Sequence, residues 1–188
     1  MLQGLRFGAV HSIVASLAML IAFLACEGLH EVTHLWLDDH APHMHAVFVP
    51  FGVLVVLGWM YGWLSVLLVL PAALLSVYLM VGGAGMTVTI ISIAVLKVLS
   101  VPLAFSLFAA LGRDVRGDGR AANWRCVVMV GLCASVLGNV PRVVAGPMGG
   151  DSLAEMAQAM LTATAADIAG LIMVMMVVML AFRLARHA

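Results

Sequence analysis

The fold is decided by residues 46–80, which read AVFVPFGVLVVLGWMYGWLSVLLVLPAALLSVYLM. This stretch contains no charged side chain and no histidine. A helix needs about 20 apolar residues to cross the hydrocarbon core of a bilayer, so the stretch has nearly twice the length of one span. Glycines and aromatic residues at positions 58–62 interrupt it near its middle, where they suit a tight interfacial turn. We therefore expect two short spans, 46–60 and 63–80.

The composition of the whole chain agrees with a membrane protein. Of its 188 residues, 64% are hydrophobic and only 10% are charged, whereas a soluble domain carries about 25% charged residues. This excludes an ordinary soluble enzyme. Nine Lys and Arg residues balance nine Asp and Glu residues, so the chain has no net positive field that would attract nucleic acid, and we expect no nucleic-acid partner.

Further apolar stretches of span length precede and follow the central one. The sequence therefore predicts an all-α, polytopic integral membrane protein with six transmembrane helices in a single domain, residues 1–188. A histidine-rich outer loop, 30–45, and a basic cytoplasmic loop, 112–125, connect some of these helices. The expected spans are 9–29, 46–60, 63–80, 86–111, 126–145 and 156–184.

The positions of the basic residues predict the orientation. Short cytoplasmic loops retain Lys and Arg, and seven of the nine cations fall on one side if both chain ends are cytoplasmic. Six spans, an even number, agree with this N-in/C-in arrangement. We expect a multi-pass protein of a bacterial inner membrane, surrounded by membrane lipid. The cytoplasmic cations are Arg6, Arg113, Arg116, Arg120, Arg125, Arg183 and Arg186.

Histidines cluster at the outer end of the first span. Residues 30–34 read HEVTH, which matches the H-E-x-x-H pattern, in which two histidines on one helical face bind zinc and the glutamate activates a bound water. If the first helix continues beyond the membrane, His30 and His34 share a face and Glu31 is the candidate general base. The candidate metal ligands are His30, His34, His40, His43 and His45.

The histidine cluster has several interpretations. A short pattern with three fixed positions often arises by chance, so the segment is either a solvated interfacial loop or a non-catalytic site for zinc or copper. Haem ligation and a zinc-dependent hydrolase are the remaining alternatives.

Two ionisable residues lie inside expected spans. Lys97 and Asp167 each lie 11 residues from the outer end of their span, so they have equal depth and we predict a contact between them. An unpaired charge in hydrocarbon costs roughly 2.5–3.5 kcal/mol even on the insertion scale, so each is a candidate for function. A structural ion pair and a site for a ligand or a proton are equally open interpretations.

Other polar residues are expected near this pair. Asn139, Thr162 and Thr164 are candidates for the same polar interior. Arg142 lies towards the outer end of its span, where it either binds an anionic ligand or extends its side chain to the interface. The small residues Gly131, Ser135 and Gly138 predict a face for helix packing.

Part of the decisive stretch resembles a known family. Residues 48–53, FVPFGV, are followed by an apolar helix, the turn at 58–63 and the sequence PAAL at 71–74. This pattern resembles the early spans of the bacterial membrane-associated sensor domain of the first type, an integral-membrane domain of histidine kinases and diguanylate cyclases. The family has more spans than the six expected here and is joined to an output domain. The resemblance implies a sensory module that signals through a separate partner, and it assigns no catalytic residue.

These features favour a non-catalytic membrane module that senses or binds a ligand or metal and acts through a partner protein. The basic loop 112–125 or the spans themselves are the expected docking sites for that partner. The alternatives are a zinc-dependent membrane hydrolase that uses His30, Glu31 and His34, a small transporter or channel that uses Lys97 and Asp167, and an accessory subunit of a larger membrane complex.

Overall fold

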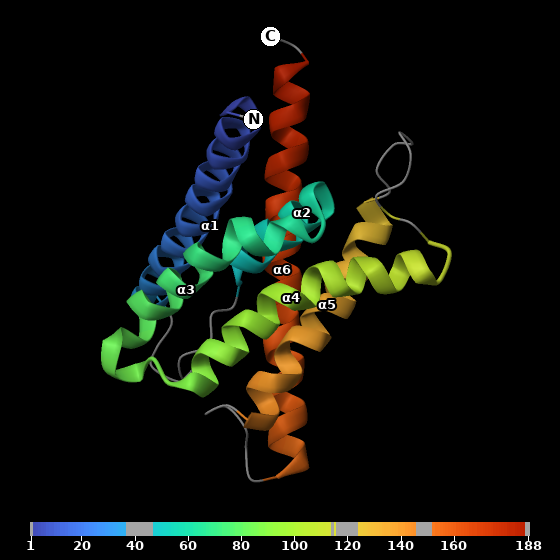
Figure 1. The fold of residues 1–188 in the computed structure, drawn as a ribbon. Coiled ribbons are helices and arrows are strands. Elements are labelled where there is room, and N and C mark those ends of the chain that lie inside the picture. Colours follow the sequence, from blue (N-terminus) through green and yellow to red (C-terminus); the bar gives the residue numbers. More distant parts are fainter. Residues whose placement is uncertain (1, 37–46, 114, 116–123, 146–151, 187–188) are drawn as a thin grey trace.

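A computed structural model describes residues 2–36, 47–113, 115, 124–145 and 152–186. Within these ranges the protein is all-helical, as expected, and contains six helices (Figure 1). The helices are α1 (Leu2–Trp36), α2 (Val49–Tyr61), α3 (Leu64–Gly85), α4 (Val88–Ala110), α5 (Trp124–Ala145) and α6 (Leu153–Ala185).

Five of the helices in the described ranges are long and apolar enough to cross a membrane. They are α1, α3, α4, α5 and α6, and the chain is accordingly a multi-pass membrane protein by architecture. The sixth helix, α2, has 13 residues and is about 20 Å long at 1.5 Å per residue. It is therefore shorter than the span expected at 46–60, and it does not cross the hydrocarbon core on its own.

Local sequence explains both ends of α2. Pro50 lies in its first turn, where the missing N–H of proline costs nothing. At the other end Gly62 adopts a positive φ of 60° and donates its N–H to Gly58 O at 2.9 Å, a conformation that glycine tolerates better than other residues. The chain turns there, and α3 begins at Leu64. The turn predicted between two apolar helices is thus confirmed.

The short helix α2 lies at the centre of the bundle. It contacts each of the other helices, and Phe51, Leu54 and Val55 on it are almost completely buried. These side chains belong to the main apolar core. Hydropathy predicts an apolar helix at this position, but the structure shows that other helices, rather than lipid alone, surround it.

A close crossing of α2 over α6 fixes the start of α2. The N–H of Phe48 donates to Ala166 O at 2.9 Å. A Cβ on Gly52 would lie 2.6 Å from Gly170 O, and a Cβ on Gly170 would overlap Phe48 O. Two glycines therefore allow the two backbones to approach, as small residues do at helix contacts in membranes. The crossing places the start of α2 beside residue 167.

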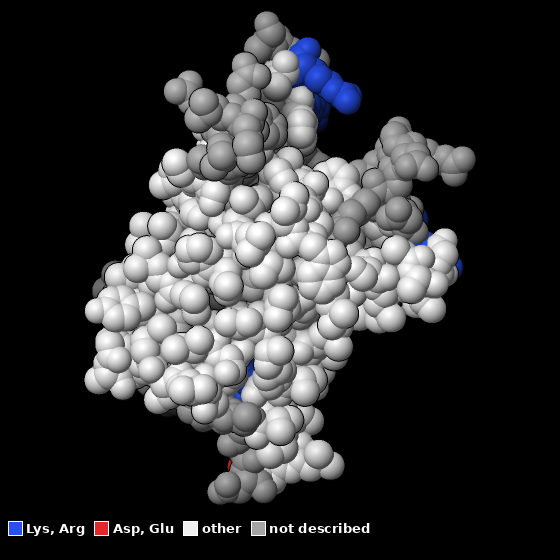
Figure 2. Space-filling model, in the orientation of Figure 1, with Lys and Arg blue, Asp and Glu red and all other residues white. Residues whose placement is uncertain are grey.

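The arrangement of the chain ends agrees with an even number of membrane segments. The N-terminal end of α1 and the C-terminal end of α6 lie at the same end of the molecule (Figure 1). Figure 2 shows a broad, largely uncharged surface, with Lys and Arg atoms at that end, at one edge and at a small spot below the middle. Exposed apolar side chains include Ile13, Leu67 and Leu161, and such side chains suit contact with lipid. The cytoplasmic location of this end stays a prediction.

Candidate functional site

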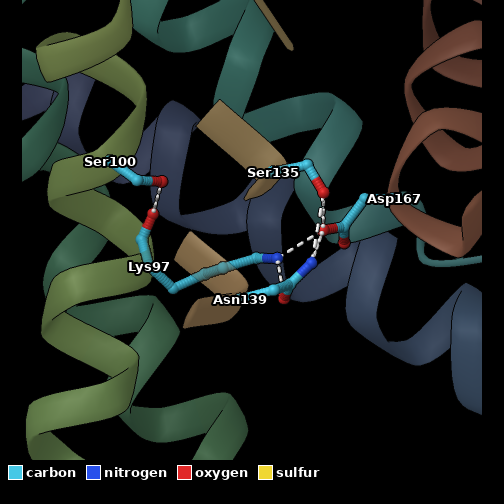
Figure 3. Close-up of polar contacts among 5 residues, drawn as sticks. All are labelled: Lys97, Ser100, Ser135, Asn139 and Asp167. Carbon is cyan, nitrogen blue, oxygen red and sulfur yellow. Dashed lines mark hydrogen bonds and ion pairs between the residues drawn. The ribbon is translucent and has the colours of Figure 1, made fainter. Parts of the chain in front are cut away.

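A buried carboxylate organises the polar interior of the bundle. Asp167 on α6 is 2% exposed. Its Oδ2 accepts hydrogen bonds from Ser135 Oγ at 2.6 Å and from Asn139 Nδ2 at 2.9 Å, and it forms an ion pair with Lys97 Nζ (Figure 3). The contact predicted between Lys97 and Asp167 is confirmed. One oxygen atom of Asp167 thus links α6 to both α4 and α5.

Lys97 is held from more than one helix. Its Nζ donates to Asn139 Oδ1 at 2.7 Å as well as to Asp167. The same nitrogen lies 4.7 Å from the centre of the Phe51 ring on α2, within the range of a cation–π interaction. The ammonium group therefore contacts side chains of α2, α5 and α6. Its side chain is 18% exposed, compared with 4% for that of Asp167.

Asn139 connects the charged groups because its amide is both a donor and an acceptor. Its oxygen accepts from Lys97, while its nitrogen donates to Asp167 and, at 3.1 Å, to Ser135 Oγ. Ser135 and Asn139 are four residues apart on α5 and therefore share one helical face. The expectation that Asn139 lies in the polar interior is confirmed.

The sequence did not indicate the roles of Ser135 and Phe51. Ser135 was expected only as a small packing residue, yet its hydroxyl donates to Asp167. Its spacing of four from Asn139 is the signal that identifies it, because both point to the same side of α5. Gly138 does act as a packing residue: a Cβ there would lie 2.8 Å from Lys97 Cδ.

The cluster is suited to hold helices together through charge. In a bilayer no water in the hydrocarbon core replaces a lost partner, so a charged group depends on the protein for its partners. Removing one member of a buried ion pair typically costs about 3–5 kcal/mol because the other charge remains buried. A proton or an anion that competes for either member would weaken contacts among α4, α5 and α6 together.

Arg142 lies at the edge of this cluster. It is half-buried on α5, three residues after Asn139, and its charge interacts with those of Lys97 and Asp167. The Arg142 guanidinium makes no hydrogen bond to any residue that the structure describes. Thr162 is exposed and donates to Gln158 O on its own helix. It does not join the cluster, contrary to the sequence expectation.

Thr164 occupies a more buried place on α6. Its hydroxyl oxygen is buried and has no hydrogen-bond partner among the described residues. It lies three residues before Asp167 and so one helical turn away on a similar face. Thr164 thus lies between the cluster and the α5–α6 connection, but no hydrogen bond to a described residue joins it to the cluster.

The histidine segment is only partly described. The backbone of α1 is helical through Trp36, so positions 30 and 34 lie one turn apart on a continuous helix, as the metal hypothesis requires. The side chains of His30, Glu31 and His34 lie outside the described residues, and so do His40, His43 and His45 entirely. No group of three His, Cys, Asp or Glu side chains suited to a metal ion occurs within the described ranges.

The fold and the cluster define an all-helical, multi-pass membrane protein with a hydrogen-bonded ion pair inside its helix bundle. No family model, no curated protein and no solved structure matches the chain. The functional argument therefore rests on the geometry of the cluster.

Proposed function

We propose that the protein is a non-catalytic sensory or ligand-binding module of a bacterial inner membrane that acts through a partner protein. It crosses the membrane with both ends in the cytoplasm, and α2 serves as the short second segment of a six-segment bundle. The observation that carries the proposal is the convergence of Lys97, Ser135 and Asn139 on one oxygen of Asp167. These residues come from α4, α5 and α6.

This convergence supports a two-state device. A ligand shifts an equilibrium between conformations only if it interacts differently with the two. Binding near Lys97 or Asp167 changes the partners of one shared carboxylate oxygen, so the contacts that join three helices change together. Movement of α4 or α5, the helices that flank the basic loop 112–125, then reaches that loop, where the partner docks.

The partner contact is tested by site-specific photo-crosslinking in membranes of the native host. A photoreactive residue replaces Arg113, which is exposed after the end of α4, in the wild-type background and in an Asp167→Asn background. The same residue at exposed Val88, at the other end of α4, is the matched control. We expect a discrete crosslinked protein from position 113 whose yield changes with Asp167→Asn, and none from position 88. No product at position 113, or an equal yield in both backgrounds, contradicts the proposal.

Transport is the second candidate, and the exposure of Lys97 favours it. A side chain that is 18% exposed beside a carboxylate that is 4% exposed is an arrangement found along proton and ion pathways. Wild-type protein and a Lys97→Met variant are reconstituted into liposomes, and proton entry driven by a membrane potential is followed with a pH-sensitive dye. Flux that depends on Lys97 supports transport, whereas equal flux in both preparations removes it.

A further inference from the structure

The central helix α2 contacts the charged cluster at one end and the basic loop at the other. At its start, the Phe51 ring lies against the Lys97 ammonium, with Nζ 4.7 Å from the ring centre. At its end, Trp59 Nε1 donates a hydrogen bond to Val115 O at 3.3 Å. Val115 belongs to the basic loop 112–125, the expected docking site for the partner. α2 therefore joins the cluster to the loop through two side chains of its own.

The groups at both contacts are packed into the protein. Phe51 is 1% exposed and belongs to the main apolar core. Trp59 and Val115 are partly buried and pack against the same core. Protein interiors are close-packed and transmit strain, because they contain little empty space that could absorb a displacement. A movement at Phe51 therefore displaces its neighbours.

α2 is also the more direct connection between Lys97 and residue 115. Phe51 and Trp59 are eight residues apart on one helix, about 12 Å along its axis, and no proline lies between them. The alternative route along α4 contains Pro102. A proline inside a helix removes a backbone hydrogen bond and is a common cause of kinks. The route through α2 is thus the stiffer of the two.

The helices that carry the ion pair hold α2 between them. Gly52 lies against Gly170 of α6, and a Cβ on Gly58 would overlap the Val101 side chain of α4. These two close approaches leave α2 little room to stay in place if α4 and α6 move relative to each other. A change in the Lys97–Asp167 pair therefore reaches α2 through its packing as well as through Phe51.

We propose that α2 transmits the state of the Lys97–Asp167 pair to the basic loop, with Phe51 as the residue that senses Lys97 and Trp59 as the residue that positions the loop. When the ammonium loses its carboxylate partner, it changes its place over the Phe51 ring. α2 then shifts, and the Trp59 hydrogen bond carries Val115 with it. Coupling of this kind needs an element with two arrangements that both sites influence. This inference rests on the proposed function, because it names the route by which the cluster regulates the docking loop.

Double electron–electron resonance in lipid nanodiscs tests the route. One pair of spin labels, at Ile13 and Arg113, reports on the loop, and a second pair, at Ile13 and Phe182, reports on α6. All three positions are exposed, and the native cysteines are replaced by alanine. We expect Asp167→Asn to shift both distances. In Trp59→Phe, which keeps an aromatic ring but lacks the indole N–H, Asp167→Asn should no longer shift the first distance but should still shift the second.

A second variant and a matched control make the test specific. Phe51→Leu keeps an apolar side chain but removes the ring, and it should also abolish the shift at position 113. It tests the route from the other end of α2, so the test does not depend on the folding of Trp59→Phe. In the control, Trp63→Phe, the lost hydrogen bond is to Ser106 Oγ on α4 and not to the loop. The shift at position 113 should therefore be retained.

Several results would overturn the route. One is the absence of any shift at position 113 in Asp167→Asn. Another is a shift at position 113 that persists in Trp59→Phe or in Phe51→Leu. Loss of the shifts at positions 113 and 182 together in Trp59→Phe would show that Trp59 has only a general structural role. Equal loss in Trp63→Phe would show that the contact with Val115 is not the specific connection.

The crosslinking experiment distinguishes failure of the route from failure of the proposed function. If Asp167→Asn changes the crosslink from position 113 but the distance shift there does not depend on Trp59, α2 is not the route and the sensory function stands. If the distance shift depends on Trp59 but the crosslink does not respond to Asp167→Asn, the route stands and the sensory function is wrong.

Discussion

Gly138 on α5 lies directly against Lys97 of α4: a Cβ added at position 138 would lie 2.8 Å from Lys97 Cδ and 2.8 Å from Ser100 Oγ. Both distances are shorter than an ordinary contact between such atoms, so even a methyl group forces the lysine stem or the helices to move. The absence of a side chain at position 138 is what brings the Lys97 ammonium to Asp167.

Gly138→Ala is therefore expected to destabilise the bundle. Overpacking a close contact costs about 1–3 kcal/mol, and here it also displaces the ion pair. Thermal unfolding of the variant in nanodiscs measures the loss. Gly28→Ala is the matched control, because a Cβ there meets nothing within 4 Å. Equal unfolding temperatures for the two variants would show that Gly138 does not position Lys97.

The ion pair should behave as a coupled unit. We expect Asp167→Leu and Lys97→Met each to lower the free energy of unfolding by about 3–5 kcal/mol, because each leaves the other charge buried without its partner. The double variant should lose less than the sum of the single losses, since neither charge of the pair is then left without its partner. A double-mutant cycle measures this coupling. Additive losses would mean that the two residues stabilise the bundle independently.

The crossing of α2 over α6 should be intolerant of added bulk. A Cβ on Gly170 would overlap the backbone oxygen of Phe48, which cannot rotate away as a side chain can. Gly170→Ala is expected to cost about 3 kcal/mol or more. Gly83→Ala, where the nearest atom is a Tyr78 side-chain carbon at 3.6 Å, is the control for adding a methyl group. An unchanged unfolding temperature in Gly170→Ala would argue against the close crossing.

Metal binding by the histidine segment is tested by elemental mass spectrometry on the purified protein. Wild-type protein is compared with a His30→Ala, His34→Ala double variant. Stoichiometric zinc or copper that is lost in the variant would support a metal-responsive module, and Glu31→Gln would then test hydrolysis. Absence of metal from the wild type would remove both the metal site and the hydrolase alternative.

Sequence alone predicted most of the helices, because membrane spans are set by length and hydropathy. It also predicted the pairing of Lys97 with Asp167, since two opposite charges at equal depth have few other partners in hydrocarbon. It predicted a short helix at 46–60, but it did not predict that α2 would lie at the centre of the bundle. Hydropathy does not distinguish a helix that faces lipid from one surrounded by protein, so the Gly52 and Gly170 contact was not foreseen.

The composition of the polar cluster was only partly predictable, because the sequence does not show which side of a helix faces its neighbour. Asn139 is conspicuous in an apolar helix, whereas Ser135 is small enough to suit helix packing and its hydrogen bond depends on the facing helix. Thr162 and Thr164 lie in the same helix, but only Thr164 has a buried hydroxyl. On the side of α6 that faces α5, Leu171 packs closely against Gly131, and the threonines themselves do not indicate which side this is.

The central claim is that the Lys97–Asp167 pair holds α4 and α6 in one of two arrangements. Double electron–electron resonance tests it directly, with spin labels at the exposed positions Leu111 and Phe182 on a background in which the three native cysteines are replaced by alanine. The account predicts one narrow distance distribution for this background in nanodiscs and a shifted or second distribution in Asp167→Asn. Glu155→Gln, an exposed control on α6, should match the background. Identical distributions in all three samples would contradict the account.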